Sequence, residues 1–142
     1  MPATLTGAID LTTILGRVVA ALRADLPESQ AGFARLLEID RSLLARIESG
    51  RNTASIDHVF LIEEAFIRSG RIRWHGDLVL VVGRVAQEVK QRGGKIFYGN
   101  LPRPDGEEDL GVSVLDRIAA VVVDQWLKDL PAKDVGEDGP LG

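Results

Sequence analysis

The segment between Ser29 and Glu64 constrains the fold more than any other part of the chain. Its apolar residues follow helical spacing in two short runs separated by a brief interruption. Ser29 and Asp40 are residue types that favour the first position of a helix, and Gly50 is the type that favours its end. The side chains expected to face inward are Phe33, Leu36, Leu37, Leu44 and Ile47. The segment therefore predicts two short helices joined by a tight turn, the second with a polar outer face.

This pattern resembles the helix-turn-helix domain of the Cro and lambda-repressor type, the XRE family, over about the N-terminal half of the chain. In that family the first helix of the motif opens with Ser-Gln and carries a small Ala where the two helices approach; here these are Ser29, Gln30 and Ala34. The resemblance implies a mostly α fold, a five-helix lambda-repressor-like DNA-binding domain. It also implies that the second helix of the motif enters the major groove of double-stranded DNA.

The same resemblance assigns roles to individual residues. Arg41, Ser42 and Arg46 would point into the groove, where an arginine fork matches the acceptors of guanine. Leu43 lies on the outward face and would meet a thymine methyl group or a sugar. Gln30, Arg51 and Asn52 would contact phosphates. The expected DNA contacts are thus Gln30, Arg41, Ser42, Leu43, Arg46, Arg51 and Asn52.

Two further positions match a structural pair of the family. Arg23 and Glu48 would form an internal salt bridge that ties the first helix to the recognition helix. The sequence departs from the pattern at the turn, where Glu38 replaces the usual Gly and costs about 1 kcal/mol in a left-handed conformation. Gly32 inside the first helix of the motif costs about 1 kcal/mol relative to Ala.

The rest of the N-terminal domain, which we place at residues 10–70, is expected to contain two more helices. After a loose start over residues 1–9, one begins at Leu11 with Asp10 or Thr12 as its cap. The other begins after Ser55 and ends near Gly70. Its expected inward side chains are Ile56, Val59, Phe60 and Phe66.

The second half of the chain resembles no family that we can name, and we expect a helical extension with one or two short strands. Residues 71–130 should form a dimerisation region and residues 131–142 a disordered tail. Within residues 71–130, the pattern predicts a short β-like segment at 71–74. It also predicts a helix that begins with Asp77 as its N-cap, and a strand over Lys95 to Tyr98. That strand could pair with 71–74 or with its own copy in another subunit. Residues 99–111 read as a loop.

The last predicted helix, Ser113 to Leu130, is apolar around most of its circumference. Such a helix must be buried on two sides. A second subunit could cover one side, with Leu115, Ile118, Val122 and Trp126 as the dimerisation residues. The alternative is that the helix lies centrally within its own chain.

Composition narrows the functional classes. The chain has no cysteine and a net charge of −4, so DNA affinity must come from local placement of arginines and must depend strongly on salt. No signal segment, membrane-spanning run, catalytic motif or metal-ligand spacing is present, so we expect a cytoplasmic protein that is not an enzyme and needs no cofactor. The acidic residues 105–109 read as a solvated loop.

The sequence thus predicts a sequence-specific transcriptional regulator, a repressor more than an activator, that reads double-stranded DNA as a homodimer. The alternative is a protein-interaction module or antitoxin-like protein that has the fold without strong DNA binding. A third hypothesis, that the protein is a small metabolic enzyme, has only the analogy of fold to support it: the enzyme cyanase joins a similar domain to a catalytic half. The residues of that catalytic half are not found here.

Overall fold

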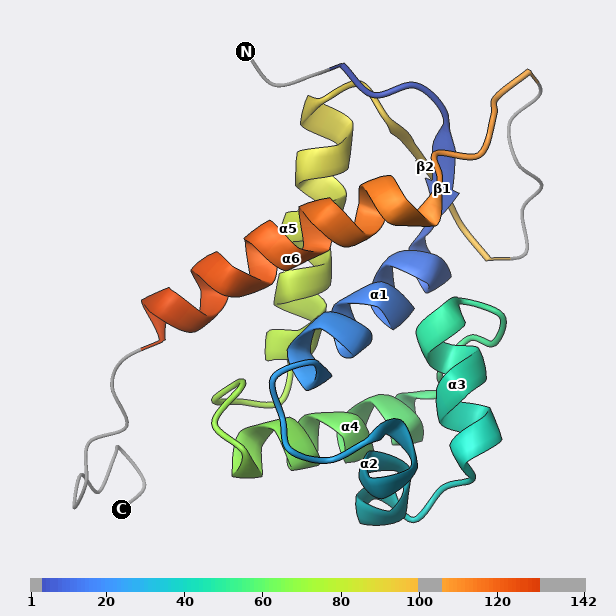
Figure 1. Cartoon of the computed structure of the whole chain (residues 1–142). Helices are drawn as coiled ribbons and strands as arrows, with labels where there is room; N and C mark the ends of the chain where they lie inside the picture. Colours follow the sequence, from blue (N-terminus) through green and yellow to red (C-terminus); the bar gives the residue numbers. More distant parts are fainter. Residues whose placement is uncertain (1–3, 100–105, 131–142) are drawn as a thin grey trace.

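The computed structural model describes residues 4–99 and 106–130, which form six helices and two short strands (Figure 1). The order along the chain is β1 (Ala8–Asp10), α1 (Leu11–Arg23), α2 (Gln30–Leu37), α3 (Arg41–Ser49), α4 (Ile56–Arg68), α5 (Asp77–Gln91), β2 (Lys95–Phe97) and α6 (Val112–Asp129). The mostly α fold expected from the sequence is confirmed. The predicted tail, 131–142, and part of the predicted 99–111 loop lie outside the described residues.

Side-chain caps begin three of the helices where the sequence predicted them. Asp10 accepts a hydrogen bond from the Thr13 N–H at 2.6 Å, and Ser29 accepts one from the Gly32 N–H at 3.0 Å. Ser55 accepts one from the N–H three residues later, at 3.1 Å. Each cap satisfies a backbone donor that has no partner within its helix.

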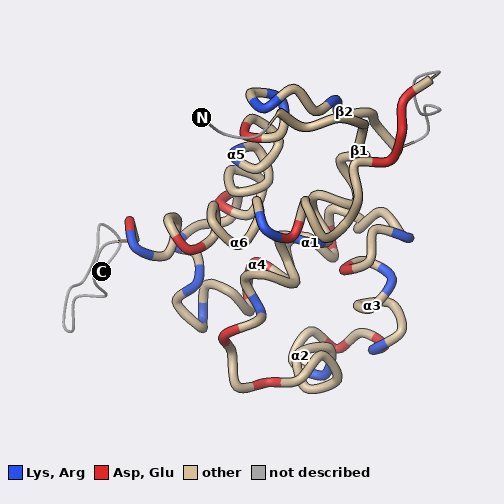
Figure 2. The backbone as a smooth tube through the Cα atoms, turned by 45° about the horizontal axis from the view of Figure 1, so that its top comes forward, with Lys and Arg blue, Asp and Glu red and all other residues tan. Residues whose placement is uncertain are grey.

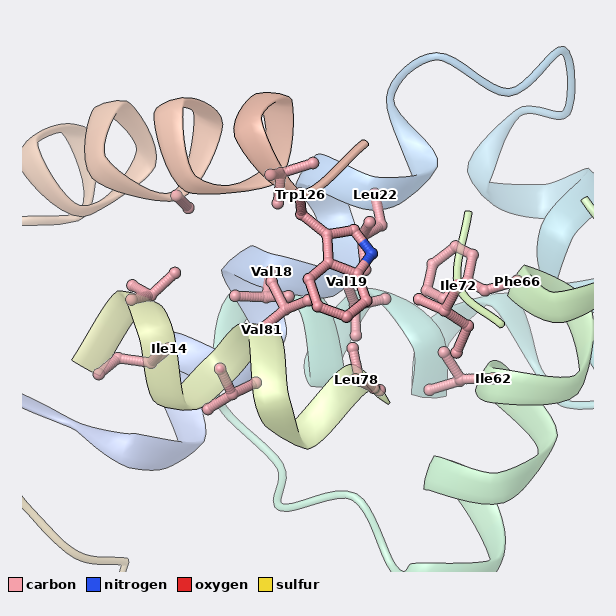
Figure 3. Packing of buried hydrophobic residues seen from close by; sticks show 14 of the residues in the cluster. Ile14, Val18, Val19, Leu22, Ile62, Phe66, Ile72, Leu78, Val81 and Trp126 are labelled. Atoms are coloured by element: carbon pink, nitrogen blue, oxygen red, sulfur yellow. The ribbon is translucent and has the colours of Figure 1, made fainter. Parts of the chain in front are cut away.

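Helix α1 lies at the centre of the molecule and packs against α3 on one side and against α5 and α6 on the other. Figure 3 shows Trp126 of α6 beside Val18 and Val19 of α1 and Val81 of α5. The buried side chains form one continuous cluster that reaches from the helix-turn-helix segment into α6. The helices of the second half therefore complete the core of the first half.

The described residues before α1, from residue 4 on, are not the loose start that the sequence suggested. Residues Ala8–Asp10 form β1, which pairs in parallel with β2, Ala8 opposite Lys95 and Asp10 opposite Phe97. The Lys95 N–H donates to the Gly7 carbonyl at 3.0 Å, and the Ala8 N–H donates to the Glu108 carbonyl at 2.7 Å. Of the two pairings that the sequence left open for the strand at Lys95, the one with 71–74 does not form, because 71–74 is irregular and connects α4 to α5.

Several side chains predicted to face inward lie on the surface. Leu36 is 58% exposed, Ile56 is 68% exposed and Phe60 is 47% exposed. Helix α2 packs against α3 and α4, and α4 packs against α2 and α5, so each buries one stripe of its surface, and these three residues lie beside it. Asp77 is not the cap of α5, because that position is Gly76; the Asp77 carboxylate instead accepts from the N–H groups of Arg73 and Trp74.

Helix α6 corrects the expected dimerisation surface. Leu115, Ile118 and Trp126 are buried within the chain's own core, and Val122 is half-buried beside them. The Trp126 indole N–H donates to the Arg71 carbonyl at 3.0 Å, so its polar atom is also used inside the chain. Helix α6 packs one side against α1 and α5, which present the apolar surface that its buried side chains need, and Val121 on its outer side is 65% exposed. Among the described residues, no helix is long and apolar enough to cross a membrane.

Candidate nucleic-acid interface

The turn between α2 and α3 is tight because Glu38 adopts the left-handed conformation, with φ 57° and ψ 41°. It is the only non-glycine residue with positive φ in the described chain. The Ile39 N–H donates to the Ala34 carbonyl at 3.1 Å and closes the end of α2. Ala34 is itself buried at the contact between the helices. The turn thus keeps the predicted geometry, with a strain of about 1 kcal/mol at Glu38.

The outer face of α3 carries the residues expected to read bases. Arg41 and Ser42 are exposed, and Arg46 and Leu43 are half-buried on the same short helix. Within the described residues, neither Arg41 nor Arg46 forms an ion pair. Figure 2 shows both acidic and basic positions along the turn and α3, so this segment is not uniformly basic. The arginines, not the overall charge, supply the donors on this face.

The segment after α3 is held close to the helix end. The N–H groups of Arg51 and Asn52 both donate to the Arg46 carbonyl, at 2.9 and 3.2 Å. In the amide orientation that satisfies its neighbours, the Asn52 side-chain oxygen accepts from Arg46 Nε at 3.3 Å. Asn52 therefore orients the Arg46 side chain, and Arg51 remains exposed for a phosphate.

The inner face of α3 is anchored by Glu48, which is 4% exposed. Arg23 of α1 donates to its carboxylate through Nε at 2.7 Å and Nη2 at 2.9 Å. Hydrogen bonding to Glu48 raises the pKa of the Arg23 guanidinium, against the opposing effect of burial, so the arginine stays charged. The structure therefore brings together the two residues predicted to pair.

Gln30 is placed between this buried pair and the surface. Its Nε2 donates to Glu48 Oε1 at 3.0 Å, and the side chain is half-buried. An amide NH₂ carries two donors, so one hydrogen can hold Glu48 while the other remains for a phosphate. Sequence reasoning found the residue but missed its bond to Glu48.

Helix α1 approaches the end of α3 unusually closely. A methyl group at Gly16 would lie 2.1 Å from the Ile47 carbonyl oxygen, so only glycine fits there. The next residue, Arg17, donates from Nη1 to the Glu48 carbonyl at 3.0 Å. Neither residue was predicted from the sequence, although a glycine inside a helix was a visible signal of close packing.

The junction between α4 and α5 holds a second buried carboxylate, Glu63, which is 1% exposed. Its Oε2 accepts from the N–H groups of Gly76 and Leu78, at 2.7 and 3.1 Å, and His75 Nδ1 lies 3.2 Å from Oε1. The His75 ring stacks on Phe60. This arrangement caps the start of α5 and lies outside the helix-turn-helix surface. Within the described residues, no group of His, Cys, Asp or Glu is arranged to hold a metal ion.

Comparison with known proteins agrees with this geometry. Residues 29–70 match the family model described as Helix-turn-helix, a family of DNA-binding regulators, and the match spans α2, α3 and α4. Neither the search of curated proteins nor the search of solved structures found a match to the chain.

Proposed function

Because residues 29–70 form a helix-turn-helix of the XRE type, we propose that the protein is a sequence-specific transcriptional regulator, acting as a repressor, whose helix α3 reads base edges in the major groove of an operator. The observation that carries this proposal is the division of α3 into two faces. Arg41, Ser42 and Arg46 lie on the outer face, whereas Glu48 fixes the inner face to α1 and α2. A helix presented in this way can dock as a rigid unit.

The charge distribution sets the expected mode of binding. The net charge is −4, and Glu38 and Asp40 are exposed at the turn that leads into α3. These carboxylates repel phosphates, so contacts with the DNA backbone alone give weak binding that falls steeply with salt. Affinity must then depend on base contacts by arginine, which favours a specific operator over random DNA.

We further propose that the regulator binds as a homodimer in the cytoplasm. One α3 reads only a few base pairs, and two copies related by a twofold axis would meet successive major grooves about 34 Å apart. The chain's own core buries Leu115, Ile118 and Trp126, so a dimer needs another surface. Helices α5 and α6 leave Val79, Leu80 and Val121 outward. Sedimentation of the protein with operator DNA tests this: one chain per operator would refute the dimer.

The experiment that tests base reading replaces Arg46 with alanine. An operator is first selected from random DNA, and its binding is then compared with that of scrambled DNA by fluorescence anisotropy at two salt concentrations. We expect Arg46→Ala to weaken operator binding by roughly 1–3 kcal/mol and to relax the preference at one base pair. The physical reason is the loss of two donors aimed at one base edge.

Lys128→Ala is the matched control, because it also removes one positive charge. Lys128 is exposed, pairs with Asp124 on the same helix, and belongs to the last turns of α6, at the opposite end of the molecule from α3 (Figure 1). It should leave operator preference unchanged. An equal loss on operator and scrambled DNA with Arg46→Ala would reduce Arg46 to a phosphate contact, and no loss would remove it from the interface.

A second candidate function is protein interaction by an antitoxin-like protein of the same fold. It is favoured by the acidic turn at Glu38 and by exposed apolar side chains on α2 and α4, namely Leu36, Ile56, Phe60 and Leu61. Gel shifts with genomic fragments at low and moderate salt separate the two. The absence of any selected fragment at low salt would favour protein interaction over DNA reading.

A further inference from the structure

The last turn of α3 is held by a residue from outside the helix-turn-helix. Arg17 of α1 donates through Nε to Asp116 Oδ1 at 2.6 Å and through Nη2 to Asp116 Oδ2 at 3.3 Å. Its remaining terminal nitrogen, Nη1, donates to the Glu48 carbonyl of α3 at 3.0 Å. Asp116 belongs to α6, far from α3 in the sequence. We call this set of contacts, from Asp116 through Arg17 to the Glu48 carbonyl, the Arg17 brace.

The geometry of Arg17 depends on Asp116. The planar guanidinium presents its donors in fixed directions, so a carboxylate that binds Nε and Nη2 also fixes the direction of Nη1. The side chains of Arg17 and Asp116 are 24% and 42% exposed, so without its partner Arg17 has room to turn toward water. The carboxylate on α6 therefore determines where the donor for α3 points.

The contact at Glu48 is well placed to fix α3. The last carbonyls of a helix have no partner within it, and a cation at this end also opposes the helix dipole. Helix α3 has nine residues, too few for a stable isolated helix, so its position is set by tertiary contacts. The Glu48 side chain is held by Arg23 and Gln30, and its carbonyl by Arg17. Glu48 is thus held by both its side chain and its backbone.

We propose that Asp116 is a positioning residue for DNA recognition, which acts through Arg17 to fix the C-terminal end of α3. Arg46 lies two residues before Glu48, and the backbone of Arg51 and Asn52 is bonded to the Arg46 carbonyl. A loosened helix end would misplace these groups relative to bases and phosphates together. The proposal rests on the DNA-reading function and assigns part of its specificity to α6, outside the matched residues 29–70.

The test replaces Asp116 with asparagine, which keeps the shape of the side chain and removes its charge. If Asp116 acts only as a nearby negative charge, its removal strengthens binding to operator and scrambled DNA alike. If it positions α3, operator binding weakens by roughly threefold to thirtyfold while binding to scrambled DNA stays level or strengthens. The two explanations therefore predict changes of opposite sign in operator affinity. Equal changes on both DNAs would overturn the proposal.

Asp124→Asn is the matched control, because it removes the same charge from the same helix and Asp124 pairs with Lys128 instead of Arg17. It should change operator and scrambled binding by the same small factor. Arg17→Lys is the second variant; it keeps the positive charge but cannot hold the carboxylate and the carbonyl with one rigid fork. It should reproduce the loss of operator preference seen with Asp116→Asn.

Hydrogen exchange of the full chain without DNA makes the brace testable even if no operator is found. In Asp116→Asn, the amides of Arg51 and Asn52 should exchange faster, because their acceptor lies in the loosened end of α3. Amides in the middle of α1 should exchange at the original rate. Unchanged exchange at Arg51 and Asn52 would overturn the brace, whereas failure to select any operator with the unmodified protein would count against the proposed function.

Discussion

The surroundings of Glu48 in α3 and of Glu63 in α4 differ in the kind of donor that compensates a buried carboxylate. Glu48 is met by side chains, the guanidinium of Arg23 and the amide of Gln30. Glu63 is met mainly by the backbone, through the N–H groups of Gly76 and Leu78, with His75 beside its other oxygen. Both carboxylates are almost completely removed from water.

The difference shows what each carboxylate stabilises. Long side chains from α1 and α2 reach Glu48, so that carboxylate fixes the relative positions of three helices. Backbone donors at the start of α5 reach Glu63, so that carboxylate shapes a connection and caps a helix whose N-terminus favours negative charge. The first arrangement orients the proposed reading helix, and the second supports the fold behind it.

The largest effect is expected where α1 and α3 touch. Gly16→Ala should lower the free energy of unfolding by about 3 kcal/mol, because the added methyl group would meet backbone atoms of Ile47 and Glu48 that cannot move aside cheaply. Urea denaturation measures the loss. The variant also tests whether the Glu48 contacts survive when the two helices are pushed apart.

Gly83→Ala is the control for this glycine. Gly83 is exposed in α5, and a methyl group there would meet no atom within 4 Å. Alanine should therefore stabilise the protein by roughly 0.5–1 kcal/mol through helix propensity. If both variants were equally tolerated, α3 would be free to shift away from α1, and the picture of a rigidly held Glu48 would fail.

Replacing each buried carboxylate with an amide should give losses of stability of intermediate size that differ between the two sites. Glu48→Gln places an NH₂ group against the donors of Arg23 or Gln30 in either orientation, so it should cost about 1–3 kcal/mol. Glu63→Gln can keep its oxygen on the N–H groups of Gly76 and Leu78 and turn its NH₂ toward His75. A neutral His75 can accept that hydrogen bond, so the cost should stay below about 1 kcal/mol.

Thermal and urea unfolding of both variants measure this difference. A double-mutant cycle with Arg23→Ala assigns the loss at Glu48 to its partner, and the coupling energy should be clearly above zero. Equal losses for the two Glu→Gln variants would mean that the type of donor does not matter. The contrast between side-chain and backbone compensation would then be refuted.

The same contrast explains what the sequence could reveal of these sites. Arg23 and Glu48 were predicted as a pair, because each residue of the pair has a recognisable position in the family pattern. The main partners of Glu63 are backbone N–H groups, which every residue except proline carries, so no residue type signals them. Gln30 was found for the same reason as Arg23, but its bond to Glu48 depends on where the helices meet.

Long-range contacts limited the prediction of the fold. Helices α1 to α4 follow local caps and apolar spacing, which the sequence shows directly. The pairing of β1 with β2 joins segments that are far apart in the sequence, and three-residue strands carry almost no alternating pattern. For α6, the sequence predicted that two sides must be covered, but Val121 on its outer side is 65% exposed, and the sequence could not show that α1 and α5 cover the other side.

The smallest effects should come from the outermost donor of each carboxylate. Gln30→Ala and His75→Ala each remove one hydrogen-bonding partner and leave the others, so each should lower the free energy of unfolding by roughly 0.5–1.5 kcal/mol. Their effects on DNA should differ. Gln30 has a second donor for a phosphate, so Gln30→Ala should weaken binding to operator and scrambled DNA by a similar factor, roughly threefold to tenfold.

His75→Ala is the matched control for this prediction, because it loosens a buried carboxylate to a similar extent at a site outside the helix-turn-helix surface. Its DNA affinity should equal that of the unmodified protein at temperatures where both are folded. If His75→Ala weakened DNA binding as much as Gln30→Ala, the loss would follow general stability and Gln30 would not contact a phosphate. If Gln30→Ala weakened only operator binding, its role would be to orient α3 through Glu48, and the two carboxylates would differ in function as well as in the donors that hold them.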